Sequence, residues 1–117
     1  MAKLTLSYNG VTLREYQLEG DSVSVGRRSD NNIRLDDPTV SGTHAIISLK
    51  PDPYLDGQVV ATLVDFNSTN GVFVNGMQVK QQKLNSGDVI RIGQHELHFD
   101  QQGAFDQTQT AVILPKE

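Results

Sequence analysis

The sequence predicts an all-β domain of antiparallel strands, arranged as a sandwich or a barrel. Apolar and polar residues alternate in about eleven short segments, which turn-forming residues separate at regular intervals. No segment shows the apolar periodicity of an amphipathic helix. A chain of 117 residues with 37% hydrophobic content is the size of one ordinary domain, and it can form a sandwich that keeps one sheet face in water.

The expected strands follow one another along the chain. Residues 3–8 and 11–18 alternate on either side of Asn9-Gly10 and predict a hairpin. Val23 and Val25 point inward from a third strand at residues 22–26. Consecutive apolar residues at 44–49 predict a strand that is buried on both faces. The other strands are expected at residues 33–35, 58–66 and 72–74, in an edge hairpin at 78–83, and at 89–92 and 95–99.

Residues 64–76 contain the most informative turn chemistry in the chain. A strand leads into polar turn residues that end at Gly71, and a very short apolar strand then leads to Asn75-Gly76. Glycine takes a positive φ at no steric cost, and Asn-Gly favours the type I′ turn of a two-residue hairpin. Taken alone, this stretch is explained as a hairpin with a polar loop.

Three polar loops contain groups that can bind an anion if they meet at one end of the domain. Arg27 offers a planar fork of donors that matches phosphate or carboxylate. Ser41 and Thr69 offer hydroxyl groups and backbone amides, and Asn70 can both donate to and accept from an extended peptide. The alternatives are an ordinary surface arginine, a turn-capping serine, and turn formers at 69 and 70.

The formal net charge of -4 and the pI of about 5.2 exclude a broad basic surface, so we expect no nucleic acid partner. An acidic protein must bind an anion through a local pocket, because its overall field opposes the ligand. No apolar run reaches the length of a membrane span, and the N-terminus lacks a signal peptide pattern. The chain contains no cysteine, which fits a reducing compartment, and we expect a cytoplasmic location.

The sequence offers no catalytic or metal-binding constellation. There is no P-loop and no Gly-x-Ser-x-Gly motif, so we expect neither an enzyme nor a cofactor. His44 has no carboxylate or second histidine at ligand spacing, while His95 and His98 face opposite sides of their strand. Asp36-Asp37 is interpreted as a turn feature rather than a metal site.

Five segments of the chain form an ordered set, and they are Gly26-Arg27, Asn32–Asp37, Val40–Ala45, Asp65–Gly76 and Leu84–Gly93. Together, in this order and at this spacing, they resemble the forkhead-associated (FHA) domain family. The resemblance covers about residues 3–100, so we expect the domain at residues 1–100, and it implies an eleven-stranded antiparallel β-sandwich of the FHA/SMAD-like type. It further implies a recognition module, typical of bacterial FHA proteins, that binds phosphothreonine segments downstream of a Ser/Thr kinase.

Position by position, the resemblance implies a phosphopeptide site. Arg27 would pair with the phosphate, Ser41 and Thr69 would contact it, and Asn70 would hold the peptide backbone. The departure is Gly42, where many family members have a polar or basic side chain that also touches the phosphate. Gly42 offers only its amide, which Arg28 or Arg34 could compensate. The residues that the resemblance implies as loop supports are Gly26, His44, Gly71, Asn75 and Gly76.

Residues 101–117 form a polar, glutamine-rich segment that we interpret as a flexible tail or a linker. Thr108 and Thr110 are candidate phosphorylation sites within it, and a phosphorylated tail could dock on its own domain or on a second copy. The alternative to phosphopeptide recognition is a structural or oligomerisation module that retains the fold without using phosphate. Gly42 is the sequence feature that favours this alternative.

Overall fold

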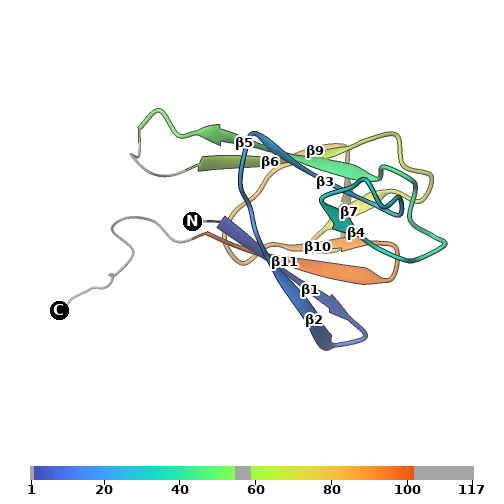
Figure 1. The fold of residues 1–117 in the computed structure, drawn as a ribbon. Coiled ribbons are helices and arrows are strands. Elements are labelled where there is room, and N and C mark those ends of the chain that lie inside the picture. Colours follow the sequence, from blue (N-terminus) through green and yellow to red (C-terminus); the bar gives the residue numbers. More distant parts are fainter. Residues whose placement is uncertain (1, 55–58, 102–117) are drawn as a thin grey trace.

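The protein is a β-sandwich of two sheets, seen in a computed structural model that describes residues 2–54 and 59–101 (Figure 1). Sheet A has six strands in the order β2 (Val11–Gln17), β1 (Ala2–Tyr8), β11 (His95–Gln101), β10 (Val89–Ile92), β7 (Val72–Val74) and β8 (Met77–Val79). Sheet B has five strands in the order β4 (Ile33–Arg34), β3 (Ser22–Gly26), β5 (Ala45–Pro51), β6 (Val59–Asp65) and β9 (Gln81–Lys83).

The architecture confirms the predicted sandwich of eleven strands, with one difference in strand direction. The paired strands run antiparallel except β3 and β4, which are parallel, with Val25 opposite Ile33 and Gly26 opposite Arg34. In a parallel pair, the connection must carry the chain back toward the start of the first strand before the second strand begins. Residues 27–32 make that return, and β3 and β4 therefore finish at the same end of the sandwich.

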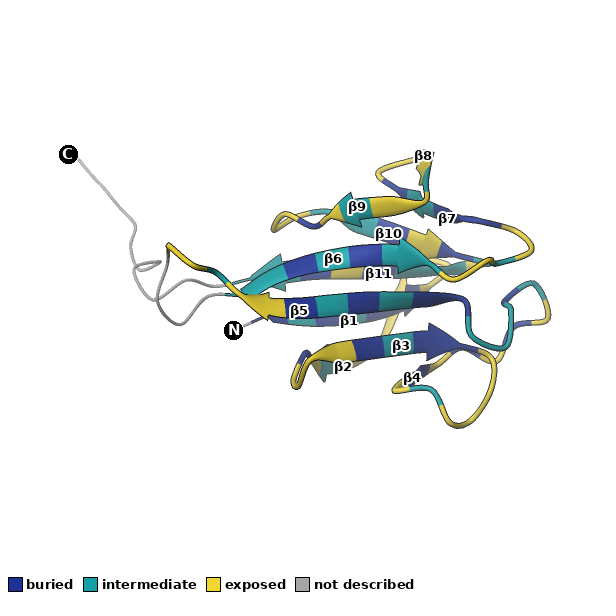
Figure 2. Cartoon of the chain, turned by 90° about the horizontal axis from the view of Figure 1, so that it is seen from above, coloured by how far each residue is buried: buried dark blue, intermediate teal, exposed yellow. Residues whose placement is uncertain are grey.

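The core lies between the two sheets and is built from alternate residues of each strand (Figure 2). Alternation follows from the two-residue period of a strand, which sends one side chain inward and the next outward. Val23 and Val25 are buried, as predicted. The largest fully buried apolar side chains are Phe99, Leu4, Ile33, Leu35, Ile47, Leu63, Ile90, Ile92 and Leu97.

Two Asn-Gly pairs close two-residue hairpins where the sequence predicts them. Asn9 and Gly10 have φ of 55° and 81° and connect Tyr8 to its register partner Val11. Asn75 and Gly76 have φ of 51° and 86° between β7 and β8. Positive φ at both central residues is the signature of the type I′ turn, whose twist matches that of the flanking strands.

The edge hairpin predicted at residues 78–83 is wrong. β8 pairs with β7 in sheet A, whereas β9 pairs with β6 in sheet B, so the chain crosses from one sheet to the other at Lys80. The Lys80 carbonyl oxygen accepts a 2.9 Å hydrogen bond from the Asp65 amide, which fixes the crossing beside the end of β6. Polar alternation in such short strands does not reveal which sheet each strand joins.

The expectation that residues 44–49 are buried on both faces is also wrong. Ala45, Ile47 and Leu49 are buried, but Ile46 and Ser48 are only half-buried. Ile46 and Ser48 lie on the outer face of sheet B, which no other layer of the described chain covers (Figure 2). Ile46 is therefore an apolar residue on the solvent side of the sheet.

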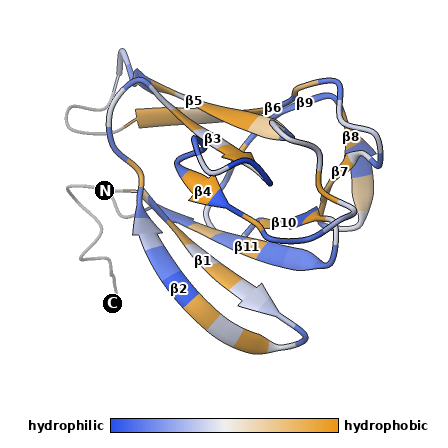
Figure 3. Ribbon diagram, turned by 45° about the vertical axis from the view of Figure 1, so that its right-hand side comes forward, coloured by the Kyte–Doolittle hydropathy of each residue, from blue (hydrophilic) through white to orange (hydrophobic). Residues whose placement is uncertain are grey.

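The β1–β2 hairpin extends away from sheet B and leaves apolar side chains in solvent (Figure 3). Val11 is 61% exposed, Leu13 is 54% exposed and Tyr8 is 43% exposed. The register between β1 and β2 shifts between Leu6 and Ser7, where β2 has a bulge. No helix in the described part of the chain has the length and apolar character that a membrane span requires. Thr108 and Thr110 lie outside the described residues.

Candidate functional site

Three loops meet at the end of the sandwich where β3, β4 and β6 finish (Figure 1). The first loop is residues 27–32, the second is residues 35–44, and the third is residues 66–71. The Arg27 amide donates to the Ser41 carbonyl oxygen at 3.0 Å, and the Arg28 amide donates to the Gly42 carbonyl oxygen at 3.1 Å. The Thr69 amide donates to Ser41 Oγ at 3.1 Å. These bonds hold all three loops to the segment around Ser41.

Gly26 allows the first and second loops to approach each other. A Cβ atom at position 26 would overlap the carbonyl oxygen of Gly42 and would lie 2.7 Å from Asn31 Nδ2. The Asn31 Nδ2 atom donates to the carbonyl oxygens of Gly42 at 2.7 Å and of Arg28 at 2.9 Å. Sequence reasoning did not identify Asn31, because a polar loop of similar residues gives no sign of which side chain turns inward.

His44 lies behind the second and third loops and is fully buried. Its Nδ1 is 2.9 Å from the Ser41 amide nitrogen, and its Nε2 is 2.8 Å from the Gly71 carbonyl oxygen. An amide can only donate and a carbonyl can only accept, so both contacts are satisfied by the neutral ring with its proton on Nε2. His44 therefore links Ser41 in the second loop to Gly71 at the end of the third loop.

Arg27 presents the end of its guanidinium to solvent while its stem is fixed. Its Nε donates to the Val40 carbonyl oxygen at 3.1 Å, and its own carbonyl oxygen accepts from Arg34 Nε at 2.9 Å. The two terminal nitrogens have no partner among the described residues. A guanidinium held at Nε keeps its outer donors aligned, which lowers the entropic cost of binding an anion.

The other predicted site residues each keep a free polar group. Ser41 Oγ accepts from the Thr69 amide, so its hydroxyl hydrogen is available to a ligand. Asn70 Nδ2 donates to the Thr39 carbonyl oxygen at 2.8 Å, which leaves its second hydrogen and Oδ1. The Gly42 amide has no acceptor among the described residues. The three loops thus present, at one end of the sandwich, a guanidinium, hydroxyl groups and an amide that each have a hydrogen to donate.

The third loop is shaped from within by two residues that sequence reasoning did not assign to the site. Ser68 Oγ accepts from the Gly71 amide at 3.0 Å, and the Ser68 amide donates to Asp65 Oδ1 at 2.8 Å. The Asp65 side chain is fully buried, and its Oδ2 lies 3.8 Å from Lys80 Nζ. Gly71 has φ of 86°, which only glycine adopts readily.

Asn75 and Gly76 lie at the far end of β7 from the third loop. Asn75 Nδ2 donates to Asp88 Oδ1 at 3.0 Å, and Asn75 Oδ1 accepts from the Val89 amide at 3.0 Å. These bonds fix the β7–β8 turn against the start of β10. This role differs from the expected support of the binding loops.

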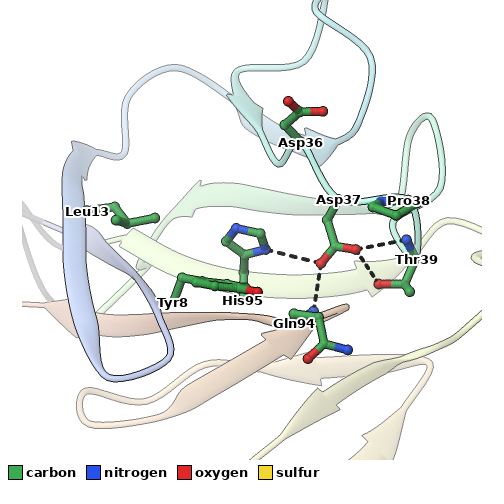
Figure 4. A pocket seen from close by; sticks show the side chains of 8 residues that line it. All are labelled: Tyr8, Leu13, Asp36, Asp37, Pro38, Thr39, Gln94 and His95. Carbon is green, nitrogen blue, oxygen red and sulfur yellow. Dashed lines mark hydrogen bonds and ion pairs between the residues drawn. The ribbon is translucent and has the colours of Figure 1, made fainter.

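A groove of about 530 Å³ lies beside the second loop, between that loop and the β1–β2 hairpin (Figure 4). Asp37 lies at its base and accepts from the Thr39 amide at 2.8 Å, the Thr39 hydroxyl at 2.6 Å and the Gln94 amide at 2.9 Å. His95 Nδ1 is 3.4 Å from Asp37 Oδ2, and the ring of His95 stacks at a tilt on Tyr8 with centroids 5.0 Å apart. Leu13 lines the outer rim.

The contacts of Asp37 determine its ionisation. Burial by itself would raise the pKa of Asp37, but the hydrogen bonds from Thr39 and Gln94 and the attraction of His95 outweigh it and lower the pKa to about 2. The charged carboxylate therefore fixes the base of the second loop against the β10–β11 turn. Within residues 2–54 and 59–101, no group of three or more potential ligands could hold a metal ion.

Arg27, Arg28 and Arg34 place three guanidinium groups at this end of the chain, where Asp30, Asp36 and Asp37 supply as many carboxylates. Arg28 Nη2 lies 3.5 Å from Asp30, and Arg34 Nη2 lies 3.9 Å from Asp36. Exposed pairs of this kind contribute little to stability, so their guanidinium groups can turn toward a ligand at small cost. Attraction of an anion at this end would therefore depend on individual guanidinium groups, because the net charge of the chain is -4.

A family model described as the FHA domain matches residues 23–93. Among proteins of similar sequence, the FHA domain-containing protein FhaA of Mycobacterium tuberculosis is 43% identical over 94 residues. That match covers 80% of this chain and 16% of FhaA, so this chain spans about a sixth of the length of that relative.

Several solved structures with the same fold are at least 35% identical to this chain, and two of them illustrate the match. One, from a structural and functional analysis of phosphothreonine-dependent FHA domain interactions, matches with a TM-score of 0.72 at 40% identity over 86% of this chain and 95% of the other. The second is EmbR of Mycobacterium tuberculosis in complex with a low affinity phosphopeptide. It has a TM-score of 0.70 at 35% identity over 85% of this chain and 24% of EmbR.

Proposed function

The chain belongs to the forkhead-associated (FHA) domain family, and from that premise we propose that it binds a phosphothreonine segment of a partner protein at the three loops. The observation that carries the proposal is the arrangement of free donors around Ser41. The guanidinium end of Arg27 and the Gly42 amide have no partner within the described residues, and Ser41 Oγ accepts from the Thr69 amide but keeps its own hydrogen to donate. Backbone bonds fix the loops that present these donors.

The strength of such a site follows from the number of charged hydrogen bonds. Each bond to a charged group contributes about 1.5–3 kcal/mol. Three or four to one phosphate would supply most of the roughly 8 kcal/mol that a micromolar affinity requires. Arg27 would take two phosphate oxygens, and Ser41 and Thr69 would donate to the remaining one. Asn70 would hold the peptide backbone through its free amide hydrogen and Oδ1.

Phosphorylation would act as the switch. A phosphothreonine has a charge of about -1.5 to -2 at pH 7, whereas plain threonine offers Arg27 no anion. A Ser/Thr kinase acting on the partner would therefore control the interaction. Binding without catalysis suits this role, and the absence of cysteine fits the reducing cytoplasm that we propose as its location.

The test is a binding titration with a degenerate phosphothreonine peptide pool and with its phosphoserine and unphosphorylated versions. We expect capture of the phosphothreonine pool only, and loss of that capture in Arg27→Ala. Arg91→Ala is the matched control. Arg91 is also exposed, but it lies on β10, and its guanidinium packs over the ring of Phe73 on the neighbouring strand β7. Equal capture of the phosphorylated and plain pools by the wild-type protein would overturn the proposal.

A second candidate function is protein recognition without phosphate, and the groove beside the β1–β2 hairpin favours it. Tyr8 and Leu13 are apolar and exposed there, and the exposed Asp36 stands at the rim. The occupant would be a partner segment with an apolar side chain followed by a lysine or an arginine, because the rim is acidic. Wild type and Arg27→Ala should both capture such a segment from an unphosphorylated peptide pool. Leu13→Asp should not capture it.

A further inference from the structure

We propose that Arg28 is a second phosphate-binding arginine, and that Gly42 provides the space that its side chain needs. The inference rests on the proposed phosphothreonine function and names a further residue of that site. It explains why a glycine at position 42 is compatible with anion binding.

The side chain of Arg28 lies over Gly42. A Cβ atom at position 42 would be 2.9 Å from Arg28 Cδ and 3.2 Å from Arg28 Cγ, so any side chain there would push the arginine stem away. The Arg28 amide donates to the Gly42 carbonyl oxygen, which also accepts from Asn31 Nδ2. The two residues are thus fixed next to each other by backbone and side-chain bonds.

The guanidinium of Arg28 is free to reach a ligand. Its side chain is 70% exposed, and its ionic partner is the equally exposed Asp30 at 3.5 Å. Exposed pairs are weak, so exchange of Asp30 for a phosphate is favourable. Arg34 is a poorer candidate because its Nε already donates to the Arg27 carbonyl oxygen at 2.9 Å.

The charge of the ligand gives the second arginine its role. A phosphothreonine has close to two negative charges and three free oxygens. The Arg27 fork spans two of these oxygens and neutralises one charge. Gly42 adjoins Ser41 in the chain, so an arginine stem that crosses Gly42 ends close to the proposed phosphate position. A second guanidinium there would neutralise the remaining charge.

The experiment is a titration of a phosphothreonine peptide selected from the degenerate pool, on wild type and four variants. We expect Arg28→Ala to weaken binding about tenfold, the size of one charged contact. Gly42→Ala should weaken it several-fold through crowding alone, because Gly42 does not have a positive φ and accepts alanine without backbone strain. Arg91→Ala, at an exposed arginine that lies over the Phe73 ring and outside the three loops, is the matched control and should bind as wild type does.

The double variant Arg28→Ala/Gly42→Arg separates this inference from a structural effect. Removal of the Arg28 stem opens the space above position 42, and an arginine there returns a guanidinium from the second loop. We expect recovered affinity for phosphothreonine peptide and unchanged thermal unfolding in all variants. If wild type binds the phosphothreonine peptide and Arg28→Ala binds it equally well, the inference is overturned but the proposed function stands. If wild type binds the phosphorylated and plain peptides equally, both the proposed function and the inference are overturned.

Discussion

The carbonyl oxygen of Gly71 lies 2.8 Å from Nε2 of His44, although 27 residues separate them in the chain. The opposite ring nitrogen accepts from the Ser41 amide at 2.9 Å. One buried imidazole therefore sets the distance between the second and third loops, and the donors proposed to bind phosphate depend on it for their relative position.

Replacement of His44 by alanine should weaken both the fold and the site. The change removes two buried hydrogen bonds, leaves a backbone donor and acceptor unpaired, and creates a cavity, so we expect a loss of about 2–4 kcal/mol of unfolding free energy. Chemical denaturation would measure it, and phosphothreonine peptide titration should show at least a tenfold loss of affinity. His98→Ala is the control, because His98 is exposed on β11. Unchanged stability in His44→Ala would contradict the bracing role.

Replacement of Gly26 by alanine should force the first and second loops apart. The added methyl group would overlap the backbone carbonyl of Gly42, which cannot move without loss of its bonds to Arg28 and Asn31. We expect a destabilisation of about 1–3 kcal/mol, typical of overpacking, together with lost peptide binding. Thermal unfolding would report the first effect. Ser29→Ala, in the exposed part of the same loop, should change neither property, and an equally stable, binding-competent Gly26→Ala would refute the steric argument.

Stability should fall below pH 4 through Asp37. Its pKa of about 2 in the folded protein lies below the value near 4 of an unfolded aspartate, so the stabilisation is complete above about pH 4 and is lost as the pH falls toward 2. Asp37→Asn should lower the free energy of unfolding by about 2 kcal/mol at pH 7. The difference in unfolding free energy between the variant and wild type should shrink as the pH falls from about 4 to about 2. Urea denaturation at several pH values would follow it.

Asp36→Asn is the control for the pH series, because Asp36 is exposed and accepts none of the hydrogen bonds that Thr39 and Gln94 donate to Asp37. It should leave the profile of the wild-type protein unchanged. A deficit in Asp37→Asn that stayed constant from pH 7 to pH 2 would show that the carboxylate charge is not the source of the stabilisation.

Asn75→Ala should separate stability from binding. The change removes bonds to Asp88 and to the Val89 amide and disfavours the positive φ of the turn, at a cost of about 1–2 kcal/mol. The turn lies at the far end of β7 from the third loop, so peptide affinity should remain that of wild type. Gln78→Ala provides an exposed control on β8. A binding defect at temperatures where Asn75→Ala is folded would place this turn within the site.

The sequence determined the features that depend on neighbours in the chain. Asn9-Gly10 and Asn75-Gly76 set their turns because only asparagine and glycine adopt positive φ at low cost. Alternation in β1 and β3 placed Leu4, Val23 and Val25 in the core. The order of the loop motifs was also sufficient to predict the family.

The tertiary structure decided what depends on pairs of residues far apart in the chain. The separation of β8 and β9 into different sheets, the passage of Arg28 over Gly42, and the bond from the Gln94 amide to Asp37 have no local signal. A side chain's identity limits the bonds that it can make, but not the partner that folding brings to it. Which of several similar polar residues becomes the brace, the ligand or the solvent-exposed neighbour is therefore set by packing, because only the assembled sandwich fixes the distances between its loops.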